Sequence, residues 1–295
     1  MIAQRLNGQQ LAGTMREELR LRCEQFVATG KDRPQLVAIL VGNHPSSRLY
    51  VNSKKKACED CGLLSQVHEY PETISATELL DQIQKLNEDP LVHGILVQLP
   101  LPPHLDSDTI LHAVHPLKDV DGFHPENVGL LGLGSPRYLP CTPFGVQQMI
   151  QRYGIPTRGK SVVILGRSNI VGKPLGLILM QKPTARFPQG GDATVTIAHS
   201  QSAHLKEITQ SAEILIVAIG KPRMVTAEMV RPGAVVIDVG IHSVGGKVVG
   251  DVDAESVEKV AAALSPVPKG VGPMTITMLL FNTLQAAELQ QSPKH

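Results

Sequence analysis

The chain has 295 residues, 42% of them hydrophobic and 19% charged, and its formal net charge is +1. This length suits one large domain or two ordinary ones. The balanced charge gives no reason to expect a nucleic acid or an anionic membrane as partner, and no run approaches the ~18 apolar residues of a membrane span. The first residues lack a signal-peptide core, and four cysteines are too few for a disulfide framework. We therefore expect a cytoplasmic protein.

The first half of the chain alternates between helical and strand patterns. Apolar residues at helical spacing predict a first helix that ends at Gly30, and a second carries Tyr50 and Lys54 and ends at Gly62. Ser75 and Glu78 form a capping box that opens a third. Continuous apolar runs predict strands at 35–42 and 93–99, with a shorter strand at 65–70 and a short helix at 107–114. This β-α-β-α order implies an α/β fold with a mostly parallel sheet.

Residues 116–145 break this pattern, because Gly, Pro, Asn and Asp dominate them. A long irregular stretch within a compact domain is usually functional or lies between domains. Thr142 and Pro143 then resemble an N-cap and a first helical residue, which predicts a helix to about Tyr153. We place a domain boundary near this point.

The next segment has the order that a dinucleotide site needs, namely strand, glycine turn and helix. Val162 to Leu165 form the strand, Gly166 begins the turn, and a helix follows from about Val171. The spacing Gly166, Gly172, Gly176 is neither G-x-G-x-x-G nor a Walker A loop. Taken alone, the pattern fits a plain structural turn as well as a nucleotide site.

Three further runs, 193–200, 213–220 and 234–240, predict buried strands. The last two end at Gly220 and Gly240, where a cofactor could approach closely. NAD sites commonly carry an acid at the end of the second strand, whereas this chain has the neutral segment 199–202, which includes Ser200. With Arg167 and Ser168 in the turn, these residues favour NADP.

Eight segments, in this order along the chain, carry a resemblance to a known protein family: YVNSKKKAC, GILVQLPLP, KDVDGFHPENVG, PCTPFG, GRSNIVGKP, VVIDVGI, GDVD and SPVPKGVGPMT. In this order they resemble the bifunctional methylenetetrahydrofolate dehydrogenase/cyclohydrolase family over nearly the whole chain. The resemblance implies a two-domain α/β protein. It places a folate-binding catalytic domain at 1–145, completed by a C-terminal helix at 275–295, and a Rossmann-type NADP domain at 146–274. It also implies a homodimer through the Rossmann domain and a role in one-carbon metabolism and purine biosynthesis.

The resemblance assigns a role to each of four residues. Lys54 matches the catalytic lysine, which a partly desolvated site would let shuttle a proton. Gln98 matches the residue that hydrogen-bonds this lysine, and Tyr50 matches the residue that packs on the folate ring. Asp121 matches the residue that accepts hydrogen bonds from the pterin N–H groups. Further substrate contacts are expected from Val97, Leu99, Pro100, Gly272 and Pro273. Cofactor contacts are expected from Gly166, Arg167, Ser168, Val171, Gly172, Ser200, Gly220, Gly240 and Ile241.

Each role has an ordinary structural alternative. A lysine in a KKK run is usually a solvated helix-face residue, a strand-end Gln is often structural, and Asp119 and Asp121 would ordinarily be turn residues. The ordered motifs favour the functional reading of Lys54, Gln98, Tyr50 and Asp121. Cys58 and Cys61 lie in a predicted helix without a second pair, which favours packing over redox chemistry or zinc. We predict no metal.

Two main departures from the family pattern are visible, beside a minor one, Ser265 where threonine is common. Lys269 stands where the family has glycine, in a segment whose Gly272–Pro273 bond we expect to be cis, and residues 181–192 are longer than in many relatives.

Three alternative functions also stay open. One is a short-chain dehydrogenase, because Tyr50 and Lys54 have the spacing of the catalytic Tyr-x-x-x-Lys pair of that family. In those enzymes the pair follows the glycines of the dinucleotide site in the sequence, whereas here it precedes them. The others are a monofunctional dehydrogenase, with NAD as an alternative to NADP, and a non-catalytic folate- or nucleotide-binding protein.

Overall fold

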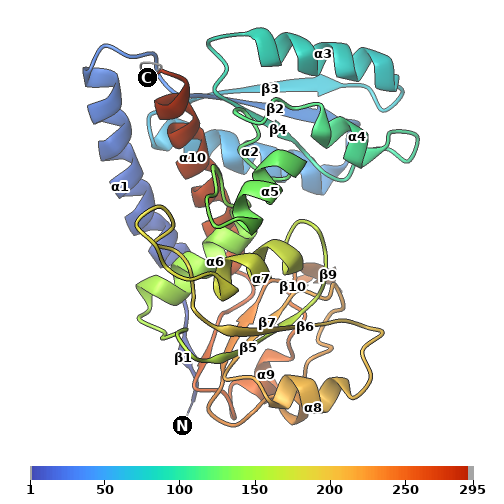
Figure 1. Ribbon diagram of the computed structural model, residues 1–295. Helices are drawn as coiled ribbons and strands as arrows, with labels where there is room; N and C mark the ends of the chain where they lie inside the picture. The colour runs from blue at the N-terminus through green and yellow to red at the C-terminus, as the bar shows by residue number, and fades with distance from the viewer. Residues whose placement is uncertain (1, 292–295) are drawn as a thin grey trace. The chain divides into compact units, whose positions relative to one another are not determined.

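The computed structural model describes residues 2–291, and their contacts divide them into two compact units, whose elements are labelled in Figure 1. The three-stranded unit comprises Thr14–Leu130, Arg137–Cys141 and the residues from Ile276 onward. The six-stranded unit comprises the residues up to Gly13, Leu131–Pro136 and Thr142–Thr275. None of the helices within residues 2–291 is long and apolar enough to cross a membrane.

The three-stranded unit is built on a parallel sheet in the order β3-β2-β4. β3 and β4 are the two edge strands, yet all residues of β2 and β4 are buried, whereas no residue of β3 is fully buried. The predicted capping box is present at the start of α3: the Ser75 hydroxyl accepts from Glu78 N, and the Glu78 carboxylate accepts from Ser75 N. The elements are β2 (Gln35–Val41), α2 (Pro45–Asp60), β3 (Leu64–Tyr70), α3 (Ala76–Glu88), β4 (Gly94–Val97) and α4 (Ser107–His112).

The six-stranded unit is built on a second parallel sheet, in the order β1-β11-β8-β7-β5-β6. From β5 the chain runs first to β6 on one side and then to β7 on the other. The carboxyl ends of β5 and β7 therefore form a topological switch point, where open α/β sheets bind ligands. Its elements are β1 (Gln4–Arg5), β5 (Ser161–Leu165), α7 (Gly172–Met180), β6 (Thr194–Ala198), α8 (Leu205–Gln210), β7 (Ile214–Val217), η1 (Ala227–Met229), β8 (Val235–Asp238), β9 (His242–Val244), β10 (Lys247–Val249), α9 (Ala254–Val257) and β11 (Ala263–Leu264).

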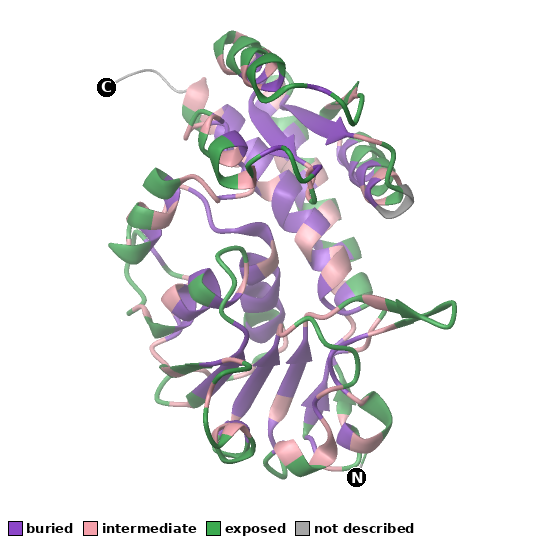
Figure 2. Ribbon diagram, turned by 90° about the vertical axis from the view of Figure 1, so that its right-hand side faces the viewer, coloured by how far each residue is buried: buried purple, intermediate pink, exposed green. Residues whose placement is uncertain are grey.

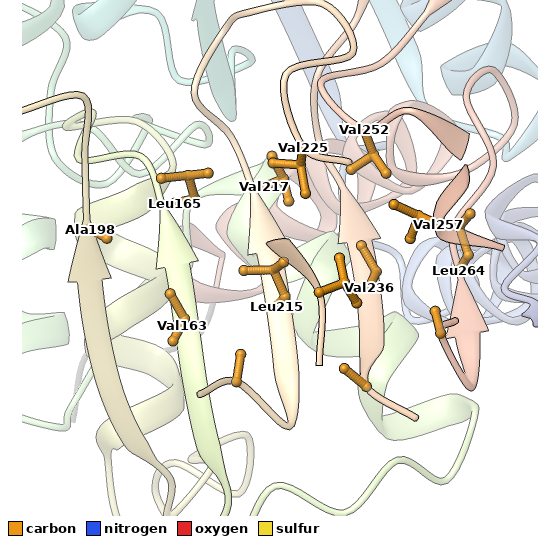
Figure 3. Close-up of a cluster of buried hydrophobic side chains, with 14 residues drawn as sticks. Val163, Leu165, Ala198, Leu215, Val217, Val225, Val236, Val252, Val257 and Leu264 are labelled. Atoms are coloured by element: carbon orange, nitrogen blue, oxygen red, sulfur yellow. The ribbon is translucent and has the colours of Figure 1, made fainter. Parts of the chain in front are cut away.

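Aliphatic side chains fill both interiors, as the near absence of aromatic residues predicts. Buried residues follow the central strands of both sheets in Figure 2. In the six-stranded unit, valines and leucines of β5, β7, β8 and β11 form one cluster with valines and alanines of β6, α9 and the neighbouring loops (Figure 3). A second cluster packs β2 and β4 against α3 and α4 in the three-stranded unit. Each fully buried Val, Leu or Ile side chain contributes about 1.5–3 kcal/mol through removal from water.

Four helices contribute residues to both units: α1 (Gly8–Ala28), α5 (Pro125–Gly132), α6 (Cys141–Arg152) and α10 (Val271–Gln290). The segment before Gly13 differs from the predicted domain bounds, because β1 pairs in parallel with β11 of the six-stranded sheet. A two-residue strand carries no periodic signal, so no local pattern separates it from the first domain. Met1 and residues 292–295 of the predicted bounds lie outside the described residues. The bounds themselves stay a prediction.

The α/β fold with parallel sheets is confirmed, and four local predictions are wrong. The strand at Thr194–Ala198 is largely exposed, with Ala198 its one buried residue, because it forms an edge of the sheet. Thr142 is not an N-cap, because α6 already begins at Cys141. The stretch 116–145 contains α5, and the antiparallel hairpin β9–β10 was not predicted. Gly272–Pro273 is not cis; the cis bonds in the described chain are Leu99–Pro100 and Val267–Pro268.

Candidate functional site

Helix α2 places Tyr50 and Lys54 together, as their spacing of four residues predicts. The Lys54 Nζ lies 5.2 Å from the centroid of the Tyr50 ring, within the range of a cation–π contact. Lys54 is only 7% exposed, although its neighbours Lys55 and Lys56 are exposed. The ordinary reading of the KKK run therefore holds for two of its three lysines, and Lys54 points into the unit.

The Gln98 side chain meets this lysine from the end of β4. Its backbone N donates to Ile39 O at 2.9 Å, which extends the pairing with β2 by one residue. Its Nε2 donates to Leu99 O at 2.7 Å, so its Oε1 is the atom that faces Lys54 and accepts from Nζ at 3.1 Å. The strand end thus fixes both the position and the orientation of the amide that contacts Lys54.

Asp121 completes this cluster and interacts electrostatically with Lys54. Burial lowers the pKa of Lys54, and the Asp121 carboxyl opposes that shift. Burial likewise raises the pKa of Asp121, and Lys54 opposes it. Burial also raises the pKa of Tyr50, with a smaller contribution from Asp121. The site therefore brings the two ionisable partners closer to their neutral forms, a condition that suits proton transfer.

Cys141 belongs to the same cluster and was missed as a site residue. Its thiol is buried, forms a hydrogen bond with Asp121, and also lies 3.3 Å from Val120 O. Burial and the Asp121 charge raise the pKa of Cys141 well above its usual value, so the thiol stays protonated and acts as a donor. The PCTPFG motif carried the signal, but nothing in it indicated which residue Cys141 would meet.

The two acids of KDVDGF have different roles in the structure. The Asp119 carboxylate accepts bonds from the N–H groups of Phe123 and His124, at 3.1 and 2.8 Å, and from Asn127 Nδ2 at 2.8 Å. Asp119 is therefore the turn-forming residue, as the structural alternative predicted. Asp121 is the acid that interacts with Lys54.

Asn282, on α10, fixes the two segments that carry Asp121 and Cys141. Its Nδ2 donates to Val120 O at 2.7 Å and to Leu139 O at 2.9 Å, which uses both amide hydrogens. Among the described residues its buried Oδ1 has no hydrogen-bond partner. A side chain that is distant in sequence thus positions the backbone next to Asp121, and no local pattern could have revealed it.

A cavity of about 400 Å³ opens at the carboxyl ends of β2, β3 and β4. The chain residues around it include the loop after β2 and the segment that follows Gln98: Val41, Gly42, Asn43, His44, Glu72, Pro100, Leu101, Pro102 and Pro103. Of the other predicted substrate contacts, Val97 is buried in β4 and Leu99 is half-buried. Gly272 and Pro273 belong to the six-stranded unit, in the first turn of α10.

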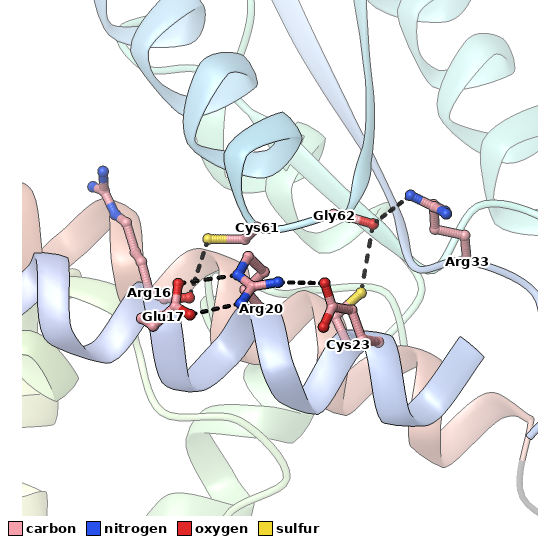
Figure 4. Close-up of polar contacts among 8 residues, drawn as sticks. Arg16, Glu17, Arg20, Cys23, Arg33, Cys61 and Gly62 are labelled. Atoms are coloured by element: carbon pink, nitrogen blue, oxygen red, sulfur yellow. Dashed lines mark hydrogen bonds and ion pairs between the residues drawn. The ribbon is translucent and has the colours of Figure 1, made fainter. Parts of the chain in front are cut away.

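The cysteines predicted to be packing residues are free and buried. Cys61 Sγ lies 3.6 Å from Arg16 O, and Cys23 Sγ lies 3.5 Å from Gly62 O. Figure 4 shows both contacts. Burial raises the pKa of Cys58 to about 12 and that of Cys61 to about 11. Both thiols therefore stay protonated near neutral pH, which makes them poor nucleophiles.

The glycine turn after β5 has the close backbone approach that a dinucleotide site requires. Gly166 adopts φ +137°, and a Cβ there would lie 2.2 Å from Ala218 O. A Cβ on Gly172 would lie 2.1 Å from Gly166 O. Ser168 Oγ accepts from Val171 N at 3.1 Å and so helps to cap α7. Only glycine fits either position, and the turn lies at the switch point of the sheet, so these residues fit a dinucleotide.

The remaining cofactor candidates follow the strand ends of the same sheet. Arg167 and Ser168 in the turn are exposed, as are Ser200 after β6 and Gly220 after β7. Gly240 is half-buried and Ile241 is 55% exposed. All nine predicted cofactor residues lie in the six-stranded unit, in the turn and in the loops after β6, β7 and β8.

The two departures from the family pattern also have defined structures. Lys269 adopts φ +84°, a left-handed conformation that favours glycine and costs a side-chain-bearing residue about 1 kcal/mol or more. In the long 181–192 segment, Gln189 O accepts from Gln147 Nε2 at 3.2 Å, and Gly191 N donates to Ile178 O at 3.2 Å. That segment therefore contacts α6 and α7.

Fold and site together define a class: a two-unit α/β protein with one dinucleotide-type sheet and one site built around a buried lysine. The catalytic-domain model of tetrahydrofolate dehydrogenase/cyclohydrolase matches residues 6–121, and the NAD(P)-binding-domain model of the same family matches residues 140–291. The chain belongs to the tetrahydrofolate dehydrogenase/cyclohydrolase family.

Individual relatives match along nearly their full length. The bifunctional protein FolD of Rhodopirellula baltica is 52% identical, over 98% of this chain and 99% of that protein. The bifunctional FolD structure from Campylobacter jejuni has a TM-score of 0.90 at 46% identity, covering 96% of this chain and 98% of that one. The Trypanosoma brucei enzyme, solved with NADP and an inhibitor, has a TM-score of 0.89 at 35% identity and covers 98% of each chain.

Proposed function

We propose that this protein oxidises 5,10-methylenetetrahydrofolate to the 5,10-methenyl form with NADP and then hydrolyses that product to 10-formyltetrahydrofolate. Family membership and the FolD relatives support both activities. The observation that carries the proposal is the buried Lys54, whose Nζ contacts Gln98 Oε1 and interacts with Asp121. A solvated surface lysine would have neither the lowered pKa nor these partners.

We propose that the folate-binding catalytic domain corresponds to the three-stranded unit and the NADP domain to the six-stranded unit. In the first, Tyr50 packs on the folate ring, Asp121 binds the pterin N–H donors, and the segment at Val97, Leu99 and Pro100 lines the substrate. In the second, the turn at Gly166–Gly172 and the loops at Ser200, Gly220 and Gly240–Ile241 hold NADP. We assign Gly272 and Pro273 to substrate contacts.

When bound in the glycine turn at Gly166–Gly172, NADP would supply the hydride acceptor for oxidation of the methylene carbon, and the oxidised folate is a methenyl cation. That cation is electrophilic, so the hydrolysis needs a base for the attacking water and groups that orient it. Lys54, with its lowered pKa, takes and returns this proton, and Gln98 holds the ammonium in place. Asp121 keeps the pterin oriented while the ring opens.

An initial-rate assay with methylenetetrahydrofolate tests the proposal, with NADP compared against NAD and methenyl accumulation followed by absorbance. We expect NADP reduction to be preferred and the methenyl product to be consumed. A monofunctional dehydrogenase would accumulate methenyltetrahydrofolate, and a binding protein would reduce neither cofactor. Intact Lys54 and Gln98 argue against both alternatives.

We also propose a cytoplasmic homodimer that provides formyl groups for purine biosynthesis. The four free, buried cysteines are consistent with a reducing compartment. The six-stranded unit exposes the edge strand β6 and three apolar residues at the hairpin, Ile241, Val244 and Val248. A second copy would cover such an edge, and analytical ultracentrifugation measures whether one does.

A further inference from the structure

Two buried carboxylates connect the loops that follow β7 and β8. Asp251 is 0% exposed and Asp238 is 3% exposed. Charged groups are almost never buried this deeply unless they are paired or hydrogen-bonded. The partners of these two acids therefore show what the buried charge does.

Asp251 joins the loop after β7 to the loop after β8. Its Oδ2 accepts from Ile219 N at 2.8 Å and from Gly220 N at 2.9 Å. Its Oδ1 lies 2.6 Å from Nε2 of His242, the first residue of β9. One side chain thus holds two consecutive amides of the first loop and the imidazole that follows Ile241 in the second.

Asp238 fixes the segment that carries Asp251. Its Oδ1 accepts from Gly240 N and from Asp251 N, both at 3.0 Å, and its Oδ2 accepts from Val252 N at 2.9 Å. Burial raises the pKa of Asp238 to about 6, and its backbone bonds oppose that shift. The carboxylate at the end of β8 therefore sets where Asp251 lies.

Two glycines make room for these carboxylates. A Cβ on Gly240 would lie 2.4 Å from Asp251 Oδ1, and a Cβ on Gly250 would lie 1.8 Å from Asp238 Oδ2. Neither glycine has a positive φ. The glycine of VVIDVGI (Gly240) and that of GDVD (Gly250) are thus required because the two carboxylates pack against them. The two motifs therefore form one packed and hydrogen-bonded unit.

We propose that Asp251, positioned by Asp238 and paired with His242, is a positioning residue for NADP. It sets the spacing between the Gly220 loop and the Gly240–Ile241 loop, the two strand-end loops that the proposed function assigns to the cofactor. The inference rests on that assignment. Because Asp251 is fully buried, it acts through the backbone of these loops and does not itself touch the cofactor.

The test is Asp251→Asn in the full-length protein, with both activities measured. Asparagine keeps the shape but has one acceptor oxygen, so its NH₂ must face either the Ile219 and Gly220 amides or His242. We expect the KM for NADP to rise about tenfold, as for loss of a hydrogen bond to a charged group. Hydrolysis of added methenyltetrahydrofolate needs no NADP, and its kcat/KM should stay within about twofold.

Asp253→Asn is the matched control. It removes the same charge two residues further along the chain, from a carboxylate that lies outside this hydrogen-bond network. It should leave the KM for NADP unchanged. Equal losses of both activities in Asp251→Asn, an unchanged KM, or the same effect in Asp253→Asn would each overturn the proposal. A wild-type protein with neither activity would instead contradict the proposed function.

His242→Ala is a second variant, which tests the positioning role of Asp251 if Asp251→Asn does not fold. It removes a half-buried partner and leaves the amide bonds to Asp251 in place. We expect the KM for NADP to rise about threefold, with hydrolysis of methenyltetrahydrofolate unchanged. An unchanged KM for NADP in this variant would count against the positioning role.

Discussion

The two units prepare their ligand regions in opposite ways. In the three-stranded unit, the site consists of polar side chains that are buried, Lys54 and Cys141, or half-buried, Gln98 and Asp121. In the six-stranded unit, the turn depends on missing side chains, since a Cβ at Gly166 or Gly172 would collide with a carbonyl. The first arrangement tunes proton affinity, and the second lets a ligand approach the backbone closely.

This difference predicts which activity each substitution affects. A change among the reactive side chains should alter chemical steps on the folate, while the NADP region stays intact. A change among the glycines should alter cofactor affinity, while hydrolysis of the methenyl product stays intact. The two activities therefore act as internal controls for each other.

Lys54→Met should have the largest effect. Methionine fills a similar volume but cannot carry a proton, so the hydrolysis of methenyltetrahydrofolate should fall by about 10²–10⁴-fold. Folate affinity should change little, as measured by equilibrium binding. Lys55→Met, at the neighbouring exposed position, is the control. Undiminished hydrolysis in the Lys54 variant would refute its assigned role.

Gly172→Ala should raise the KM for NADP by about a hundredfold, because the added Cβ would lie 2.1 Å from Gly166 O and force the turn open. Steady-state kinetics with varied NADP measure this change. Gly13→Ala adds the same atom where nothing lies within 4 Å, so it should leave both activities unchanged. If the two alanine variants behave alike, the turn does not hold the cofactor.

Asp121→Ala should weaken folate binding by about tenfold to a hundredfold, through loss of charge-assisted hydrogen bonds. Isothermal titration with the folate substrate measures the dissociation constant. The Asp121 carboxyl raises the pKa of Lys54, so its removal should also lower that pKa and shift the pH profile of hydrolysis towards lower pH. A dissociation constant equal to that of the wild type would contradict the assignment.

Lys269→Gly should have the smallest effect, and it changes stability. Relief of the left-handed conformation should raise the free energy of unfolding by about 0.5–1 kcal/mol, after the extra entropy of glycine in the unfolded chain is subtracted. Lys182→Gly, at an exposed position without a positive φ, should lower it by a similar amount. Urea denaturation measures the free energy of unfolding of each variant. A decrease in both variants would show that Lys269 is not strained.

Local patterns predicted most of the elements and missed those whose signal lies elsewhere in the chain. The apolar runs of β2 and β5 and the capping box of α3 act within a few residues, so the sequence showed them. The exposure of β6 depends on its being last in the sheet order, and β1 exists only because it pairs with β11. Neither property is encoded in the segment itself.

The site divides in the same way. The spacing of Tyr50 and Lys54 is local, but the contact of Lys54 with Gln98 joins residues 44 positions apart and was expected only through the family resemblance. Asn282 acts on Val120 from 162 positions away. Asp251 was overlooked because GDVD contributed to the family resemblance without indicating what its acids would contact, and only the fold brings Asp251 to Gly220.

The pairing of β1 with β11 bears on how the protein is synthesised. Gln4 aligns with Ala263, and Ile276 onward belongs to the unit that begins at Thr14. The segment that carries β1 must therefore wait for β11, and the residues from Thr14 must wait for α10, before either unit is complete. Such non-local closure slows folding, and a ribosome that stops before α10 releases a chain in which neither unit is whole. Expression of one half alone, cut at any single point, would give an incomplete product.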